Sequence, residues 1–167
     1  LGASVLRKLL NKKLACLNSP LLVTGTSGLS PKEYWIINRV NDHETKCVVY
    51  CPDRKFFDLL LKDFSQFLYS NFVCVSGKMS AKIRTRNLGI FQNDPKCKCL
   101  LLAGVGKFGL NLQCADLLIF ATVPKSFFEY QQLVGRLVRI RQKSVVSCEL
   151  LYMSGTYEAD LVKKVFG

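Results

Sequence analysis

The patterns that mark metal sites, membrane segments and self-contained nucleotide hydrolases are missing from this sequence. One histidine and eight cysteines occur among the 167 residues, and no two cysteines form a Cys-x-x-Cys pair at zinc-site spacing. No apolar run approaches the roughly 20 residues of a bilayer-crossing helix, and no signal peptide is visible. The phosphate-loop pattern Gly-x-x-x-x-Gly-Lys-Ser/Thr is absent as well. These absences predict no metal site and no membrane segment, and they disfavour a nucleotide hydrolase that works from this chain alone.

Acidic residues are scarce relative to basic ones. The sequence has 24 Lys and Arg but 12 Asp and Glu, which gives a formal net charge of +12. A polyanion is therefore the first partner to expect, although a solvated basic surface of no special purpose would have the same composition. Apolar residues make up 49% and charged residues 22%, which is globular composition at a length that suits one domain.

The cysteines indicate an intracellular setting, and neither they nor the single histidine indicate a metal site. Because the cysteines are spread over a full-sized domain, we expect reduced, partly buried thiols in a reducing compartment. His43 lies in the polar stretch 41–45, which predicts a surface position. The chain begins at Leu1 rather than at methionine, so we expect it to be a piece of a longer protein.

Short runs of apolar and β-branched residues predict the strands of one sheet. Most runs are continuously apolar rather than alternating, which is typical of parallel strands covered by helices on both faces. The runs are Cys47–Cys51, Phe72–Ser76, Cys99–Ala103, Leu117–Ala121 and Val146–Met153. Segments long enough for crossover helices separate most of them, so we predict an α/β fold with a mostly parallel sheet.

Helical spacing of apolar residues marks the segments that flank these runs. Helices are predicted over 53–69, 79–94, 127–140 and 157–166. Asp53 and Ser80 are candidate caps of the first two, since their side chains can accept from the free amides of a first turn.

Upstream of the first strand, Ser30 and Glu33 have the spacing of a capping box around Pro31, which predicts a helix through roughly residue 40. Val5–Leu17 is a candidate basic amphipathic helix, and a loop rich in Gly, Ser and Thr follows it. We therefore divide the chain into a helical lead-in and loop over 1–29 and one domain over 30–167.

Three loops that leave the predicted strands are rich in glycine and basic residues. Ligands of parallel α/β sheets gather at such loops, where glycine lets amides approach a phosphate and guanidinium groups grip its oxygens. The residues concerned are Gly77, Lys78, Lys82, Arg84 and Arg86, then Gly104, Gly106 and Gly109, then Arg136, Arg139, Arg141 and Lys143. Arg136 and Arg139 are three positions apart, so one helix would project both from the same side toward a phosphoryl group. An ordinary solvated helix face is the alternative.

Taken in order, these segments resemble the C-terminal RecA-like lobe of superfamily-two helicases, most closely the Swi/Snf-like ATPases. The resemblance covers roughly Ser30 to the end, from SPKEYWI through the strand KCVVYC to the closing VVSCELLYMSGTYEADLV. The matching positions are Gly77, Arg84 and Phe91, then Gly106, Gly109, Leu110, Asn111, Leu112, Ala115 and Asp116 of motif V, then Gln132, Arg136, Arg139, Ile140 and Gln142 of motif VI. The chain departs from the family at Ala103, where motif V has threonine, and at Lys107 and Arg141, where the motifs have glycine.

The resemblance implies a motor divided between two lobes. ATP and Mg²⁺ would be held mainly by an N-terminal RecA-like lobe, and Arg136 and Arg139 would reach across as arginine fingers. Gln132, Gly109 and Asn111 would line the ATP cleft. The nucleic acid would meet Gly77, Lys78, Arg84, Gly106 and Lys107, mostly through backbone phosphates.

The implied function is ATP-driven translocation on nucleic acid, with duplex DNA as the expected track, in the nucleus or at a site of viral replication. The isolated chain is expected to be a monomer that hydrolyses no ATP. Three alternatives stay open: a non-catalytic basic module that only binds nucleic acid, an RNA-directed helicase of the same superfamily, and a helicase-like scaffold that has lost activity.

Overall fold

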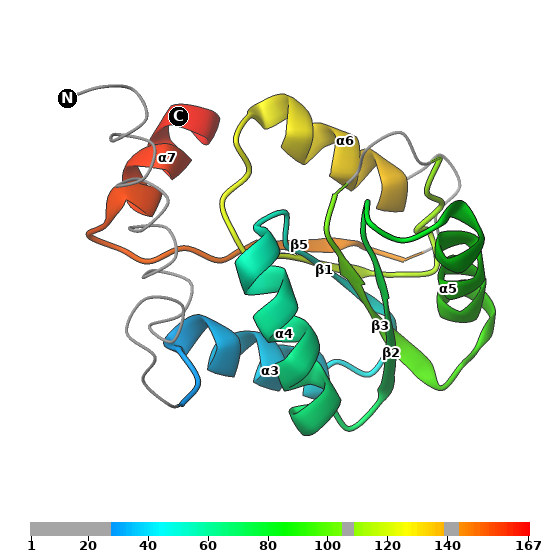
Figure 1. The fold of residues 1–167 in the computed structure, drawn as a ribbon. Coiled ribbons are helices and arrows are strands. Elements are labelled where there is room, and N and C mark those ends of the chain that lie inside the picture. Colours follow the sequence, from blue (N-terminus) through cyan, green and yellow to red (C-terminus); the bar gives the residue numbers. More distant parts are fainter. Residues whose placement is uncertain (1–27, 105–108, 139–143) are drawn as a thin grey trace.

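The computed structural model describes residues 28–104, 109–138 and 144–167, and it contains one parallel sheet of five strands (Figure 1). The strands are β1 (Cys47–Tyr50), β2 (Asn71–Val75), β3 (Cys97–Leu102), β4 (Leu117–Phe120) and β5 (Ser147–Leu150). Their order across the sheet is β2-β3-β1-β4-β5, with every neighbouring pair parallel. This confirms the predicted α/β fold, although β5 ends at Leu150 rather than at Met153.

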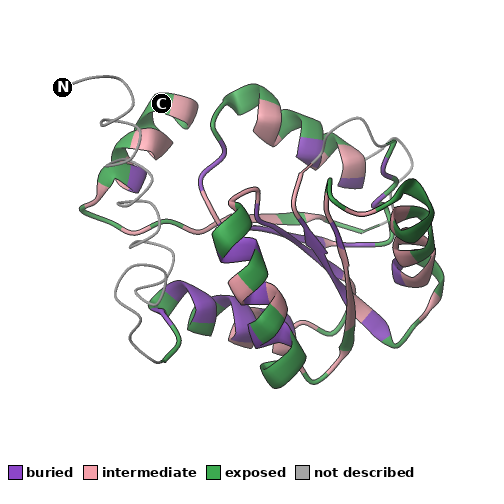
Figure 2. Cartoon of the chain, in the orientation of Figure 1, coloured by how far each residue is buried: buried purple, intermediate pink, exposed green. Residues whose placement is uncertain are grey.

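Helices cover both faces of the sheet, as the continuously apolar strands predicted. The helices are α3 (Pro31–Asn41), α4 (Arg54–Phe67), α5 (Ala81–Asn93), α6 (Phe127–Leu137) and α7 (Tyr157–Phe166). Apolar residues of α3 and α4 pack with one face, and those of α5 and α6 pack with the other. Figure 2 shows the strands mostly buried and the outer sides of the helices exposed. Among the described residues, no helix is long and apolar enough to cross a bilayer.

The predicted helix caps are present. Asp53 accepts from the amide of Phe56 at 2.8 Å, and Ser80 accepts from that of Ile83 at 3.4 Å. Ser30 and Glu33 form the capping box around the start of α3. The candidate helix Val5–Leu17 lies outside the described residues.

The helix predicted over 127–140 is shorter than expected. α6 ends at Leu137, and Val138 already has an extended backbone with φ −89° and ψ 115°. A tertiary bond contributes at this end, because the amide of Leu112 donates to the carbonyl of Arg136 at 3.1 Å. Arg136 lies in the last turn of α6, while Arg139, which was expected to project from the same side of one helix, lies with residues 139–143 outside the described part of the chain.

His43 is half-buried rather than a surface residue, which corrects the expectation drawn from its polar neighbours. Its Nε2 lies 2.7 Å from a carboxylate oxygen of Asp116, and the hydroxyl of Thr45 donates to both carboxylate oxygens, at 2.6 and 2.7 Å. Asp116 is far from His43 in sequence, so the polar stretch 41–45 carried no sign of this partner.

The described cysteines are free, as predicted: Cys47, Cys51, Cys74, Cys97, Cys99, Cys114 and Cys148. Cys47 and Cys99 are register partners on β1 and β3, and both are buried. Burial raises the pKa of the Cys99 thiol well above its ordinary value, with Cys47 adding to the effect, so this thiol stays protonated at neutral pH.

Two acidic side chains meet between α3 and α4. Asp63 is buried, and one of its carboxylate oxygens has no hydrogen-bond partner among the described residues, while Glu33 faces it from the capping box. Burial, together with the charge and hydrogen bond of Glu33, raises the pKa of Asp63 to about 7. The folded chain therefore holds a proton that the unfolded chain releases near its ordinary pKa of about 3.9.

Asp63→Asn is expected to remove a pH dependence of folding. Because the folded-state pKa of Asp63 is raised, its contribution is fully present below about pH 4 and is lost as pH rises toward 7. Between pH 5.5 and pH 8, we expect the variant to gain about 1–2 kcal/mol relative to the natural chain. Urea unfolding at the two pH values measures this difference. Asp58→Asn, at an exposed position of the same helix, is the control, and a constant offset between Asp63→Asn and the natural chain at both pH values would contradict the assignment.

Candidate functional site

The loops after β2, β3 and β4 leave the same edge of the sheet, because all the strands are parallel. β3 lies between β2 and β1, and β4 lies on the other side of β1, so these loops line up along the carboxyl-terminal edge. Nearly all the sequence-predicted site residues belong to these loops or to the helices that follow them. The topology thus brings three separate segments of the chain to one edge.

The loop after β2 is a short turn with an exposed basic tip. The amide of Met79 donates to the carbonyl of Ser76 at 3.2 Å, and Gly77 and Lys78 are exposed between them. Arg84 folds back from α5, and its Nη1 donates to the carbonyl of Met79 at 2.5 Å. The geometry gives Arg84 a part in holding this turn, while Lys78 is presented to solvent.

The loop after β3 starts with a glycine in an unusual backbone conformation. Gly104 has φ +153°, a region that side chains with a Cβ rarely adopt. Gly106 and Lys107 lie outside the described residues. Gly109 is exposed, and Leu110 and Leu112 are buried against the core on the α5 and α6 side. The buried side chains of Leu110 and Leu112 therefore anchor the second half of this loop. Gly109 and Asn111, which alternate with them, are left on its outer side.

Asn111 and Leu112 join the loop to α5 and α6. Its carbonyl accepts from the side-chain amide of Gln92 on α5 at 2.8 Å, and its own Oδ1 accepts from the amide of Gln113 at 3.2 Å. The next residue, Leu112, is bonded to the last turn of α6 through Arg136. A displacement of α5 or α6 would therefore move this loop as well.

Of the motif VI residues that were given a role at the ATP cleft, Gln132 and Arg136 lie on the described part of α6. Leu133 and Leu137 are buried beneath the helix, whereas Gln132 is exposed and Arg136 is half-buried. Gln132 and Arg136 are four residues apart, so they lie on one side of the helix. Within the described residues, the Arg136 side chain has no hydrogen bond or ion pair and is free to meet an anion. Arg139 lies outside the described residues.

Glu129 sets the beginning of α6. One carboxylate oxygen accepts from the amide of Lys125 at 2.9 Å and the other from the hydroxyl of Tyr50 on β1 at 2.6 Å. Ser126 caps the same turn by accepting from the amide of Glu129 at 3.2 Å. Burial raises the pKa of Tyr50, and the bond to Glu129 adds to the rise, so the phenol remains a donor at neutral pH. These bonds position the helix that carries Gln132 and Arg136.

A buried ion pair lies behind this edge, and the sequence patterns did not reveal it. The ammonium group of Lys32 on α3 is paired with Glu158 on α7, and it also lies 3.5 Å from the carbonyl of Ala121 at the end of β4. The second oxygen of Glu158 accepts from the amide of Met153 at 2.8 Å. Lys32 lies four residues before the buried Ile36 and eight before the buried Val40, a signal that could have placed it on the inner side of α3.

The far end of α7 contacts α6. The ring of Phe166 lies 5.0 Å from that of Tyr130 and 6.0 Å from that of Phe127, both in edge-to-face geometry. α7 is thereby bonded to α3 through Glu158 and packed on α6 through Phe166. It links the two helix layers beside the carboxyl-terminal edge.

Comparison with known families and proteins gives one consistent assignment. The family model described as "Helicase conserved C-terminal domain" matches residues 32–141, which lie inside the predicted domain. The TATA-binding protein-associated factor MOT1 of Saccharomyces cerevisiae is 29% identical over 130 residues, which cover 76% of this chain and 7% of that protein. The chain thus spans less than a tenth of this curated relative.

Two solved structures of ATPase domains share the fold. The SWI2/SNF2 ATPase core of Sulfolobus solfataricus in complex with dsDNA superposes with a TM-score of 0.77 at 23% identity, covering 98% of this chain and 36% of that one. The C-terminal part of the Fun30 ATPase domain gives a TM-score of 0.73 at 19% identity, covering 93% of this chain and 53% of that one. The fold is that of the C-terminal lobe of these ATPases.

Proposed function

Because the chain belongs to the family of helicase conserved C-terminal domains, we propose that it is the second motor lobe of an ATP-dependent nucleic-acid translocase. The observation that carries this proposal is the position of Arg136. Its side chain is without a partner in the described part of the chain, and its carbonyl is bonded to the loop that holds Gly109 and Asn111. One edge of the sheet therefore combines a group for a phosphoryl oxygen with a loop that can respond to it.

ATP with Mg²⁺ is the cofactor that the family implies, and the residues of this edge fit the part that a second lobe would take. Arg136 supplies a planar donor fork suited to phosphate oxygens, and Gln132 lies one turn before it. No Gly-Lys-Ser/Thr loop occurs in the chain, so the phosphates and the metal would be held mainly by an N-terminal lobe. When bound, the nucleotide supplies the phosphoryl group whose hydrolysis drives the motor.

Within this lobe, Arg136 and Arg139 would stabilise negative charge that develops on the transferring phosphoryl group. Such arginine fingers contribute about 10³–10⁵ in rate in known phosphoryl-transfer enzymes. Movement of α6 with the nucleotide would pull on Leu112 and Asn111 through the bond to Arg136. The Asn111 carbonyl would pass the change to α5 through Gln92.

Nucleic acid is proposed to lie against the exposed turn after β2 and the loop after β3. Gly77 and Lys78 are exposed there, and Gly106 and Lys107, which lie outside the described residues, follow β3 in the sequence. Contacts of this kind meet backbone phosphates and carry little sequence information. Duplex DNA is the proposed track, since the Sulfolobus ATPase core of the same fold is in complex with dsDNA.

The curated relatives also suggest where the longer protein acts. They are TATA-binding protein-associated factors, so we propose a nuclear setting and, as partners, DNA and an N-terminal RecA-like lobe of the same protein. The second candidate function is a non-catalytic module that binds nucleic acid through the same basic loops. The net charge of +12 favours binding in either case.

The test is an ATPase assay of this chain alone and of the longer protein that includes the region upstream. We expect no hydrolysis by the chain alone and hydrolysis stimulated by duplex DNA in the longer protein. Single-stranded DNA and duplex RNA serve as the comparison tracks. A longer protein that binds DNA but shows no stimulated hydrolysis would support the non-catalytic module instead.

A further inference from the structure

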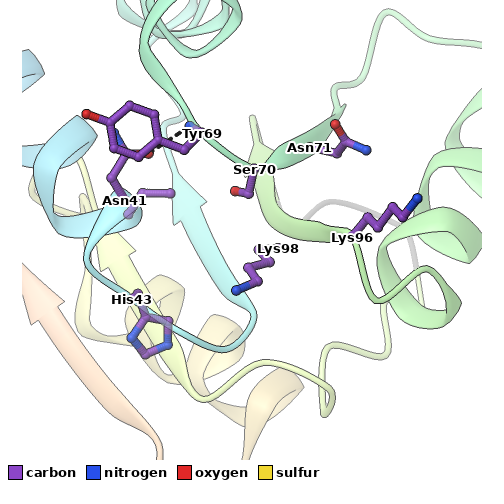
Figure 3. A pocket seen from close by; sticks show the side chains of 8 residues that line it. Asn41, His43, Tyr69, Ser70, Asn71, Lys96 and Lys98 are labelled. Carbon is purple, nitrogen blue, oxygen red and sulfur yellow. Dashed lines mark hydrogen bonds between the residues drawn. The ribbon is translucent and has the colours of Figure 1, made fainter.

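A polar hollow of about 410 Å³ opens at the amino-terminal edge of the sheet, opposite the proposed ATP edge (Figure 3). It lies where α3 ends, β2 begins and the turn before β3 enters the strand. The lining residues are Val40, Asn41, His43, Tyr69, Ser70, Asn71, Lys96 and Lys98. None of them is acidic and two are lysines, so the hollow is electropositive. The proposed function leaves this edge unused.

One wall of the hollow is held by Asn41 at the end of α3. Its side-chain amide donates to the carbonyl of Phe67 at 3.0 Å, and its Oδ1 accepts from the amide of Tyr69, also at 3.0 Å. Both polar atoms of Asn41 thus fix the turn between α4 and β2. This turn carries Tyr69 and Ser70 and is positioned before any ligand arrives.

The opposite wall is held by Lys46, just before β1. Its ammonium group donates to the carbonyls of Asp94 and Cys97, each at 2.7 Å, and so fixes the turn that leads into β3. Asp94 also accepts from the amide of Lys96 at 2.8 Å. These bonds set the backbone from which Lys96 and Lys98 extend.

The acidic group bonded to the lining residue His43 is already engaged. Asp116 is bonded to His43 and Thr45. Burial alone would raise the pKa of Asp116, but the bonds from Thr45 and His43 and the charge of His43 outweigh it and lower that pKa. The carboxylate therefore orients the imidazole.

Four polar side chains of the hollow remain available to a ligand. Within the described residues, Lys96, Lys98, Ser70 and Asn71 make no side-chain hydrogen bond or ion pair. Figure 3 shows Lys98 reaching from β3 into the space between His43 and Ser70, with Lys96 at the rim and turned outward. The hydroxyl of Ser70 and the ammonium group of the half-buried Lys98 are donors that suit the oxygens of an anion.

We propose that this hollow binds a phosphoryl group, supplied by a nucleic-acid strand or by a free phosphate compound. Lysines bind phosphate as point charges, whereas carboxylates favour the planar fork of arginine, which the hollow lacks. Tyr69 stands at the rim with its side chain almost fully exposed, 91%, and a ring so placed can stack on a base attached to the phosphate.

The position of the hollow makes its ligand separate from the proposed track. β3 spans six residues between the two edges, which is about 20 Å at the usual rise of a strand. A phosphate here would not compete with ATP or with contacts at Gly77 and Lys78. The hollow is proposed independently of the motor function, and only the choice of a nucleic-acid strand as its source rests on that function.

The experiment follows backbone amide signals of the 167-residue chain by NMR during titration with separate probes. The probes are a 5′-phosphorylated hexathymidylate, AMP, inorganic phosphate and polyglutamate. We expect the first probe to shift the signals of Ser70, Asn71 and Lys98. In the variant Lys96→Ala/Lys98→Ala, affinity at these signals falls about 10-fold, and the slope of log K against log salt falls by about 0.7, the contribution of one single-strand phosphate contact.

The control variant is Lys55→Ala/Lys62→Ala, which removes the same charge from exposed positions of α4. In this control, the oligonucleotide should still shift the signals of Ser70, Asn71 and Lys98 with the affinity of the natural chain. Equal affinity for AMP, inorganic phosphate and the oligonucleotide would identify a free phosphate compound as the source. No shift at Ser70, Asn71 and Lys98 with any phosphate probe would overturn the proposal, as would tighter binding of polyglutamate. Signals of Gly77, Lys78 and Gly109 report the opposite edge, so failure here is distinguishable from failure of the motor function.

Discussion

Arg136→Ala is expected to lower DNA-stimulated ATP turnover about 10³-fold or more in the longer protein that includes an N-terminal lobe. The side chain has no partner of its own in the described part of the chain, so its loss leaves no buried acid unpaired and should not unfold the lobe. The effect would fall on turnover, because the charge that Arg136 meets develops only as the phosphoryl group is transferred. Steady-state ATPase at saturating DNA measures it.

The variant Arg136→Lys tests whether turnover depends on the positive charge of this side chain or on the planar shape of its guanidinium group. Lysine keeps the positive charge but lacks the planar fork, so we expect turnover to stay far below that of the natural protein. Arg139→Ala is expected to behave like Arg136→Ala. Lys62→Ala, at an exposed position of α4, is the control and should keep its activity.

The non-catalytic alternative makes the opposite prediction for the same variant. If Arg136 only contacts a backbone phosphate, Arg136→Ala lowers DNA affinity and reduces the salt slope by about 1, with nothing else changed. DNA binding at several salt concentrations therefore accompanies the ATPase assay. Stimulated hydrolysis that survives both Arg136→Ala and Arg139→Ala would refute the arginine-finger assignment.

Breaking the buried Lys32–Glu158 pair is expected to cost about 3–5 kcal/mol of unfolding free energy. The two side chains are 1% and 2% exposed, so either single replacement leaves a charge buried without its partner. Burial already lowers the pKa of Lys32, although Glu158 opposes the shift. Domains are stable by about 5–15 kcal/mol, so Glu158→Gln or Lys32→Met would bring the chain close to unfolding. Urea unfolding gives the loss as a shift in midpoint.

The double variant Lys32→Met/Glu158→Gln is the informative comparison. It removes both charges, so it should be more stable than either single variant, because no uncompensated charge remains. Asp160→Asn, at an exposed position of α7, is the control and should change stability by less than about 0.5 kcal/mol. A double variant as unstable as the sum of its singles would show that the pair acts through packing rather than through charge.

Local signals were enough for the elements that carry the site. Asp53, Ser80 and the capping box of Ser30 and Glu33 could be recognised because each bond joins residues three apart, so the pattern and the contact lie in the same few letters of sequence. The end of α6 could not be recognised in this way. A residue from another loop, Leu112, bonds to its last turn, and the periodicity of residues 127–140 contains no trace of that bond.

Part of the candidate site could likewise be recognised from local sequence, and part could not. Gln132, Arg136, Gly109 and Asn111 were found through motifs, and the structure brings the loop and the helix together through the bond between Leu112 and Arg136. The Tyr50–Glu129 bond and the electropositive hollow were not found. Lys96 and Lys98 are ordinary surface lysines in the sequence, and only the fold brings them to Ser70 and Asn71.

The amino-acid sequence by itself determined the sheet, its parallel character and the two-sided burial of its strands, because these follow from the order and periodicity of apolar residues. It also determined that segments rich in glycine and basic residues would follow the carboxyl ends of the strands. The tertiary structure alone decided which charges meet. Lys32 and Glu158 are 126 residues apart in the sequence, and they come within ion-pair distance only when α3 and α7 are folded beside the same sheet. Charge pairing depends on the distance between two groups in space and on their burial, and the local sequence pattern specifies neither.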